Sequence, residues 1–171
     1  MRRMTFIALL TAISLCIFII EAQIPLPVPF PGVKCGLSNI IVLVTMILLD
    51  KKAAFSVLFL KIVLSSCLLG LGLGTVYSFL GGALAFLVML LLLKPLKNYI
   101  WVISTLGAVA HNTGQIIAAV IFMGKVSLAY YPVLVISGII TGAFTGIISQ
   151  SIILKSSYIN KLFSELGKGK K

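Results

Sequence analysis

The sequence has few charged residues and almost no acidic ones. Of its 171 residues, 10% are charged and 60% are hydrophobic, whereas soluble domains carry about 25% charged residues. Too few polar side chains remain to cover a water-facing surface, so the composition predicts an integral membrane protein. The acidic residues are Glu21, Asp50 and Glu165, too few for most hydrolytic and metal-dependent chemistry.

Other reactive groups are also scarce. The three cysteines, Cys16, Cys35 and Cys67, form no Cys-x-x-Cys pair and have no histidine nearby. We interpret them as small packing residues; a bridge between Cys35 and Cys67 is conceivable, but the sequence does not support it. We expect neither a metal nor a cofactor. The Gly-x-Gly-x-Gly run at 70–74 follows no strand, so it predicts a turn rather than a dinucleotide site.

Apolar runs separated by charged or Gly/Pro-rich segments predict an all-α membrane protein, a bundle of six transmembrane helices. The predicted spans form one integral membrane domain and are followed by a basic cytoplasmic tail at 155–171. The second span covers only about 22 Å, short of the ~30 Å hydrocarbon core. Either it thins the bilayer, or the segment before it is drawn into the membrane. The spans are 4–22, 35–49, 53–70, 75–93, 99–123 and 132–154.

The net charge of +11 reflects membrane topology rather than nucleic-acid binding, because the basic residues form no face with interleaved aromatics. With the N-terminus inside, eleven basic residues fall on the cytoplasmic side and two, Lys34 and Lys125, outside. Lys61 lies within a span. This distribution predicts a multi-pass protein of the cytoplasmic membrane with both termini in the cytoplasm. The eleven are Arg2, Arg3, Lys51, Lys52, Lys94, Lys97, Lys155, Lys161, Lys168, Lys170 and Lys171.

The first span resembles a signal peptide in its basic start. Its apolar core exceeds the roughly 7–15 residues of a signal peptide and no Ala-x-Ala site follows, so we expect an uncleaved span. Ala8 and Ala12 form a small-xxx-small face that allows close approach of another helix. In the sixth span, Gly138, Gly142 and Gly146 form a similar face, for which we favour helix packing over substrate contact.

The segment 24–39 carries prolines at four alternate positions from Pro25 to Pro31. Proline fixes φ and restricts the preceding residue, so this segment predicts a stiff, polyproline-like outer loop. It delivers Lys34, Ser38 and Asn39 to the start of the second span. Backbone N–H groups and the helix dipole favour an anion there. A connector without a binding role is the alternative.

Polar groups within spans are candidates for function because lipid penalises them. They are Lys34 with Asn39, Lys61, and His111 with Asn112 and Gln115. Three alternatives stay open. Lys61 could extend back to the cytoplasmic surface, the fifth-span group could bond neighbouring helices, and Lys34 could be an ordinary interfacial lysine.

Two motifs resemble a known family. They are Pro-Phe-Pro-Gly-Val-Lys-x-Gly-Leu-Ser-Asn at 29–39 and Ala-His-Asn-x-Gly-Gln at 110–115. With the overall length, they resemble the Gx transporter family, also catalogued as heptaprenyl diphosphate synthase component I. This family is similar to the substrate-binding S components of energy-coupling factor transporters. The resemblance implies six helices, an outward pocket, a gating loop between helices one and two, and docking of a transmembrane coupling subunit at Ala8 and Ala12.

We therefore expect an S-component-like subunit that takes up a small anionic or amphipathic molecule. The expected binding residues are Lys34, Asn39, Lys61, His111, Asn112 and Gln115. Separate ATPase subunits would supply the energy, because the chain has no ATP-binding loop. Prenyl-chain elongation binds Mg²⁺-diphosphate through aspartate-rich motifs, and Asp50 is the one aspartate, so we expect no enzyme. The alternatives are a non-catalytic membrane subunit of a prenyl diphosphate synthase or quinone-pathway enzyme, and a purely structural bundle.

Overall fold

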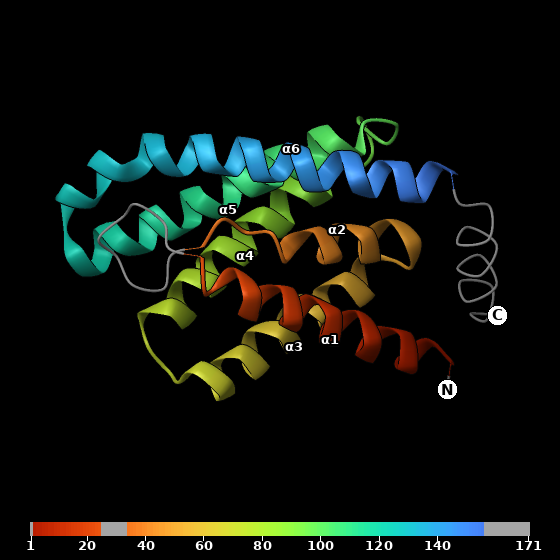
Figure 1. Ribbon diagram of the computed structural model, residues 1–171, viewed down its shortest axis with the longest axis horizontal. Helices are drawn as coiled ribbons and strands as arrows, with labels where there is room; N and C mark the ends of the chain where they lie inside the picture. The colour runs from red at the N-terminus through yellow and green to blue at the C-terminus, as the bar shows by residue number, and fades with distance from the viewer. Residues whose placement is uncertain (1, 25–33, 156–171) are drawn as a thin grey trace.

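A computed structural model describes residues 2–24 and 34–155, which form six α-helices and one 3-10 helix (Figure 1). The predicted proline-rich loop, from Pro25 to Gly32, lies outside the described residues, and so does the predicted basic tail after Lys155. In chain order the helices are α1 (Arg2–Glu21), α2 (Asn39–Leu48), α3 (Lys51–Leu69), α4 (Leu73–Leu92), α5 (Ile100–Met123), the 3-10 helix η1 (Lys125–Tyr130) and α6 (Tyr131–Lys155).

Five of these helices, α1, α3, α4, α5 and α6 together with η1, are long and apolar enough to cross a membrane. The exception is α2, which has ten residues. The apolar segment predicted to span from 35 to 49 is therefore helical over Asn39–Leu48 alone. At 1.5 Å per residue this helix is about 15 Å long, half of a ~30 Å hydrocarbon core.

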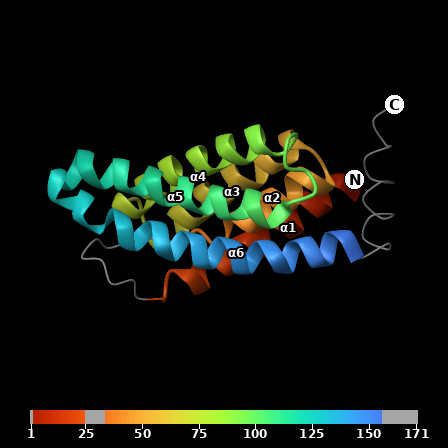
Figure 2. The same ribbon diagram turned by 90° about the horizontal axis from the view of Figure 1, so that it is seen from above.

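The helices run roughly side by side along the long axis (Figures 1 and 2). The most extensive packing joins α4 to α5 and α5 to α6, and α1 packs on α3. The short α2 contacts all five of the other α-helices. Its Val42, Leu43 and Met46 are buried in a core with Val57 of α3 and Ile103 of α5. The shortest α-helix therefore lies at the centre of the bundle.

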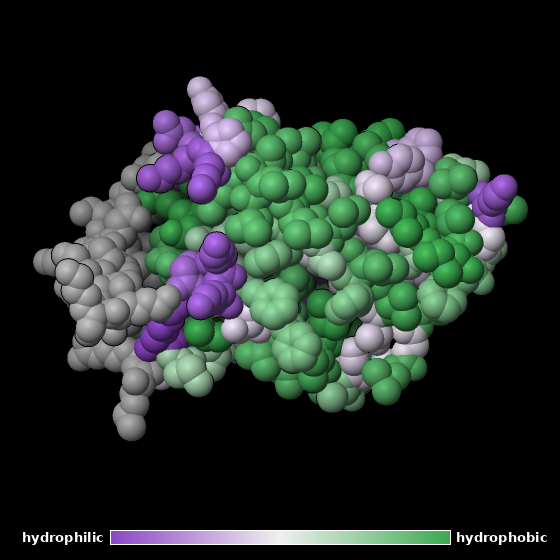
Figure 3. Space-filling view, turned by 180° about the vertical axis from the view of Figure 1, so that it is seen from behind, coloured by the Kyte–Doolittle hydropathy of each residue, from purple (hydrophilic) through white to green (hydrophobic). Residues whose placement is uncertain are grey.

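The surface matches a lipid environment. Large apolar side chains such as Phe55, Leu91, Ile121 and Phe144 are more than half exposed. Figure 3 shows a mostly hydrophobic band, with the strongly hydrophilic residues toward the ends. These observations support a multi-pass membrane protein, because water-soluble proteins rarely expose apolar patches this large.

The end of the bundle where α1 begins also holds the α2–α3 turn. There the Asp50 side chain accepts a hydrogen bond from the backbone N–H of Ala53 at 2.8 Å and so caps α3. Arg3 of α1 forms an ion pair with the same carboxylate. This contact fixes the start of α1 against the turn.

The glycines of α6 pack against α5. A Cβ on Gly142 would lie 2.7 Å from the Cα of Thr105, and a Cβ on Gly146 would lie 2.6 Å from the Cα of Trp101. At Gly138 the nearest atom would be Nδ2 of Asn112, at 2.9 Å. The packing interpretation of this glycine face is confirmed.

Candidate functional site

The chain approaches α2 through a buried, non-helical segment, residues 34–38. About 15 Å separate both Asn39 and Lys61 from the α2–α3 turn along their helices. The two residues meet, because Nζ of Lys61 donates to Oδ1 of Asn39 at 2.8 Å. The start of α2 therefore lies level with the middle of α3, and the segment before it enters the bundle. This placement is consistent with the second of the two expectations for the short span, in which the preceding segment is drawn into the membrane.

Non-helical backbone inside a membrane protein is tolerated where the protein satisfies its polar groups. The Glu21 side chain, at the end of α1, does so for three successive N–H groups. It accepts from Gly36, from Leu37 at 3.1 Å and from Ser38 at 3.4 Å. The Ser38 carbonyl accepts from the hydroxyl of Ser14 at 3.1 Å. We call the three N–H groups of residues 36–38 the anion nest.

Gln115 of α5 satisfies the backbone of Lys34. Its Oε1 accepts from the Lys34 N–H at 3.0 Å, and its Nε2 donates to the Lys34 carbonyl at 2.9 Å. The same Nε2 contacts Nε2 of His111. An amide NH₂ can only donate, so Nε2 of His111 is the acceptor and the imidazole is neutral.

Two glycines from distant parts of the chain enclose the His111 ring. A Cβ on Gly36 would lie 2.9 Å from Cδ2 of His111, and a Cβ on Gly81 of α4 would lie 2.8 Å from its Cε1 and Nδ1. Gly36 also has φ of 86°, which favours glycine. Both positions exclude a larger side chain while the ring stays in place.

The charges of the cluster do not balance. Lys34 and Lys61 are 7% and 2% exposed, and Glu21 is 2% exposed. Lys61 donates to two neutral oxygens, Oγ of Ser38 at 3.2 Å and Oδ1 of Asn39. The Lys34 ammonium lies 3.1 Å from the centre of the Phe18 ring, a cation–π contact. Within 2–24 and 34–155, neither lysine forms an ion pair, so two buried cations accompany one carboxylate.

The structure brings together five of the six binding residues predicted from the sequence: Lys34, Asn39, Lys61, His111 and Gln115. The sixth, Asn112, faces α6 and donates to the Leu134 carbonyl at 2.6 Å. The alternative that polar residues of the fifth span hydrogen-bond neighbouring helices is therefore correct for Asn112. Extension of Lys61 to the cytoplasmic surface is wrong, because its ammonium points to α2. Lys34 is also buried, with its ammonium against the Phe18 ring, which favours a role inside the protein over an ordinary interfacial lysine.

Glu21 is the site residue that sequence reasoning missed. In the sequence analysis it is one of the three acidic residues and has no role. The sequence did contain a signal for it, because an ionisable side chain that borders an apolar span is a candidate for function.

Asn39 borders a second polar feature. Its Nδ2 has no hydrogen-bond partner in the described part of the chain. A cavity of about 10 Å³ lies beside it, and its lining includes Ser104 of α5 and Thr141 and Thr145 of α6. This space accommodates about one water molecule.

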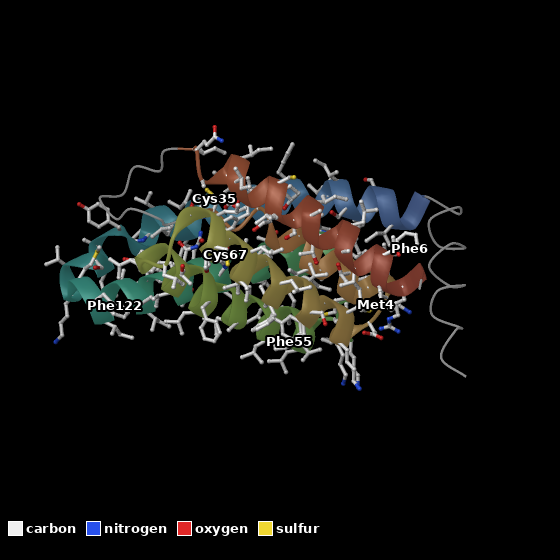
Figure 4. All side chains as sticks on the ribbon, turned by 90° about the horizontal axis from the view of Figure 1, so that it is seen from below. Met4, Phe6, Cys35, Phe55, Cys67 and Phe122 are labelled. Atoms are coloured by element: carbon white, nitrogen blue, oxygen red, sulfur yellow. The ribbon has the colours of Figure 1, made fainter. Side chains whose placement is uncertain are left out.

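A larger apolar groove of about 930 Å³ opens between α3 and α4. Phe55, Phe59, Phe79, Phe86 and Cys67 line it. Figure 4 labels Phe55 and Cys67, which lie near opposite ends of α3. All three cysteines are free thiols, and Cys35 is buried.

The predicted docking residues Ala8 and Ala12 lie exposed on α1.

Comparison with known proteins gives one family. No curated protein and no solved structure matches the chain. The model of the family described as heptaprenyl diphosphate synthase component I matches residues 10–152, which include most of the described helices. The match confirms the resemblance under this name, and the chain belongs to the heptaprenyl diphosphate synthase component I family.

Proposed function

We propose that the protein is the substrate-binding subunit of an energy-coupling factor type transporter and binds a small anionic or amphipathic molecule. The observation that carries the proposal is the buried excess of positive charge, with Lys34 and Lys61 against Glu21. Burying an unpaired cation is costly, and an anionic ligand would supply the missing charge.

The start of α2 adds to this preference. The N-terminus of a helix attracts anions through its free N–H groups and its dipole. Membrane transporters use helices interrupted near the middle of the bilayer in this way. The apolar side chains around the cluster, Phe18 and Ile40 among them, suit a ligand with an apolar body.

Transport would need partners. The chain lacks an ATP-binding loop, so separate ATPase subunits would act through a membrane coupling subunit. Ala8 and Ala12 are exposed on α1, and small residues allow close contact between helices in a membrane. This face is the proposed docking surface for the coupling subunit.

Native mass spectrometry of gently extracted protein tests the proposal. We expect the wild type to retain a small anionic molecule. Lys34→Gln and Lys61→Met should lose it, because each removes one of the buried cations. Lys125→Gln, which changes an exposed lysine in η1, is the matched control. Equal retention by all four proteins would contradict the proposal.

The family name favours a second candidate, a non-catalytic membrane subunit of a heptaprenyl diphosphate synthase. Affinity purification from native membranes separates the two. Recovery of a soluble prenyl synthase with aspartate-rich motifs, without ATPase subunits, would favour the synthase subunit. Recovery of a coupling subunit with its ATPases would favour transport.

A further inference from the structure

We propose that the anionic group of the ligand binds in the anion nest, at the position that the Glu21 carboxylate occupies in this structure. Glu21 would then be an internal competitor for the ligand. The inference rests on the proposed function and names its binding position. The ligand class is an amphipathic carboxylate or phosphate monoester, whose anionic oxygens offer the same acceptors as Glu21.

The nest already binds an anion of this kind. Three successive N–H groups, from Gly36 to Ser38, point to one carboxylate. The positive φ of Gly36 turns the backbone immediately before α2, and α2 directs the positive end of its dipole to the same place. Lys61 is adjacent, because its ammonium donates to the hydroxyl of Ser38 at 3.2 Å.

A second, independent observation also indicates a ligand here. Asn39 is 2% exposed, and its Nδ2 has no hydrogen-bond partner among residues 2–24 and 34–155. The same Nδ2 would lie 3.3 Å from a Cβ built on Gly36, so this donor borders the nest. Glu21 leaves it unsatisfied. A third oxygen of the ligand, or a larger anionic group, would supply an acceptor in place of the one water molecule that the adjacent cavity accommodates.

Glu21 is placed so that it can leave. It is the last residue of α1, and residues 22–24 after it are exposed. No ion pair holds its carboxylate in the described part of the chain. Replacing one carboxylate by another anion keeps the hydrogen bonds of the nest. When Glu21 moves toward the exposed end of α1, the ligand takes over its role beside both lysines.

Glu21→Gln is the decisive variant. Glutamine keeps one acceptor oxygen for the nest but carries no charge and adds a donor, so it competes poorly. The probes are hexanoate and hexyl phosphate, and the readout is the thermal unfolding midpoint of purified protein against probe concentration. A site that is occupied internally for nine-tenths of the time binds about tenfold more weakly than a free one. We therefore expect Glu21→Gln to lower the half-saturating concentration about tenfold.

The two probes distinguish the chemistry of the ligand. If Glu21→Gln binds hexanoate more tightly but not hexyl phosphate, the ligand is a carboxylate. If it binds hexyl phosphate more tightly but not hexanoate, the ligand is a phosphate monoester. Asp50→Asn is the matched control, because it neutralises a carboxylate at the far end of α2. Glu21→Asp serves as a second variant if Glu21→Gln fails to fold. Aspartate is one methylene shorter and should give a smaller gain in the same direction.

The outcomes separate this inference from the proposed function. If Lys34→Gln and Lys61→Met weaken probe binding while Glu21→Gln also weakens it or leaves it unchanged, Glu21 is a structural residue and the inference is wrong. The proposed function would survive that result. If the lysine variants leave probe binding unchanged, both fail.

Discussion

Gln115 binds both polar groups of the Lys34 backbone, with hydrogen bonds of 3.0 Å to the N–H and 2.9 Å from its own amide to the carbonyl. The two residues are 81 positions apart, and the contact joins α5 to the segment that enters α2. Gln115 thus replaces the strand or helix partner that a buried peptide group normally has.

Gln115→Leu should destabilise the protein, because it leaves both groups of the Lys34 backbone buried without a partner. The cost is about 1–3 kcal/mol for each group. Thermal unfolding in detergent measures the change. Gln23→Leu is the control, since Gln23 is exposed. Similar midpoints for the two variants would show that this contact contributes little.

Gly81→Ala should disturb the His111 ring. The added methyl would lie 2.8 Å from two ring atoms and 2.9 Å from the His111 carbonyl oxygen, so α4 and α5 must move apart. Overpacking of this kind typically costs about 1–3 kcal/mol. Thermal unfolding in detergent measures this loss of stability as well.

Gly72→Ala is the matched control for Gly81→Ala, because no heavy atom lies within 4 Å of a Cβ at Gly72. We expect it to leave the unfolding midpoint nearly unchanged. If both alanine variants have the same unfolding midpoint, the close packing of Gly81 against the His111 ring contributes little to stability.

The helices followed from the sequence because apolar runs and glycine turns are local signals. The Gly70–Gly74 run predicted a turn, and α3 ends at Leu69 while α4 begins at Leu73. The pairing of His111 with Gln115 was also accessible, since residues four apart share a helix face. Asn112 follows His111 directly and is turned by about 100°, which explains why it faces α6.

The anion nest was not accessible in the same way. Glu21 contacts residues 36–38 because the chain returns on itself, and no periodicity links these positions. Gly36 and Gly81 flank one ring although they are 45 positions apart in the sequence. Such contacts depend on how three helices pack around α2. The sequence signalled the shortness of α2, and that signal indicated the correct part of the molecule.

Cysteine labelling tests the predicted orientation. In a variant with Cys16, Cys35 and Cys67 replaced by serine, a single cysteine is introduced at Lys51 or at Lys125. Both positions are exposed. Lys51 begins α3 and Lys125 begins η1, at opposite ends of the bundle (Figure 1). The distribution of basic residues predicts that Lys51 faces the cytoplasm and Lys125 the outside. An impermeant maleimide should then label Lys125→Cys on intact cells, and Lys51→Cys only after the cells are opened. The reverse pattern would contradict the orientation.

The proposed docking face on α1 gives the last prediction. Ala8→Leu combined with Ala12→Leu adds bulk to an exposed stripe without touching the core, so the protein should fold and retain its ligand. The coupling subunit and its ATPases should no longer co-purify, because close helix contact requires small residues. Ala129→Leu, on the exposed surface of η1, is the control and should keep the complex. A complex that survives the double variant would exclude this face as the docking surface and leave ligand binding unaffected.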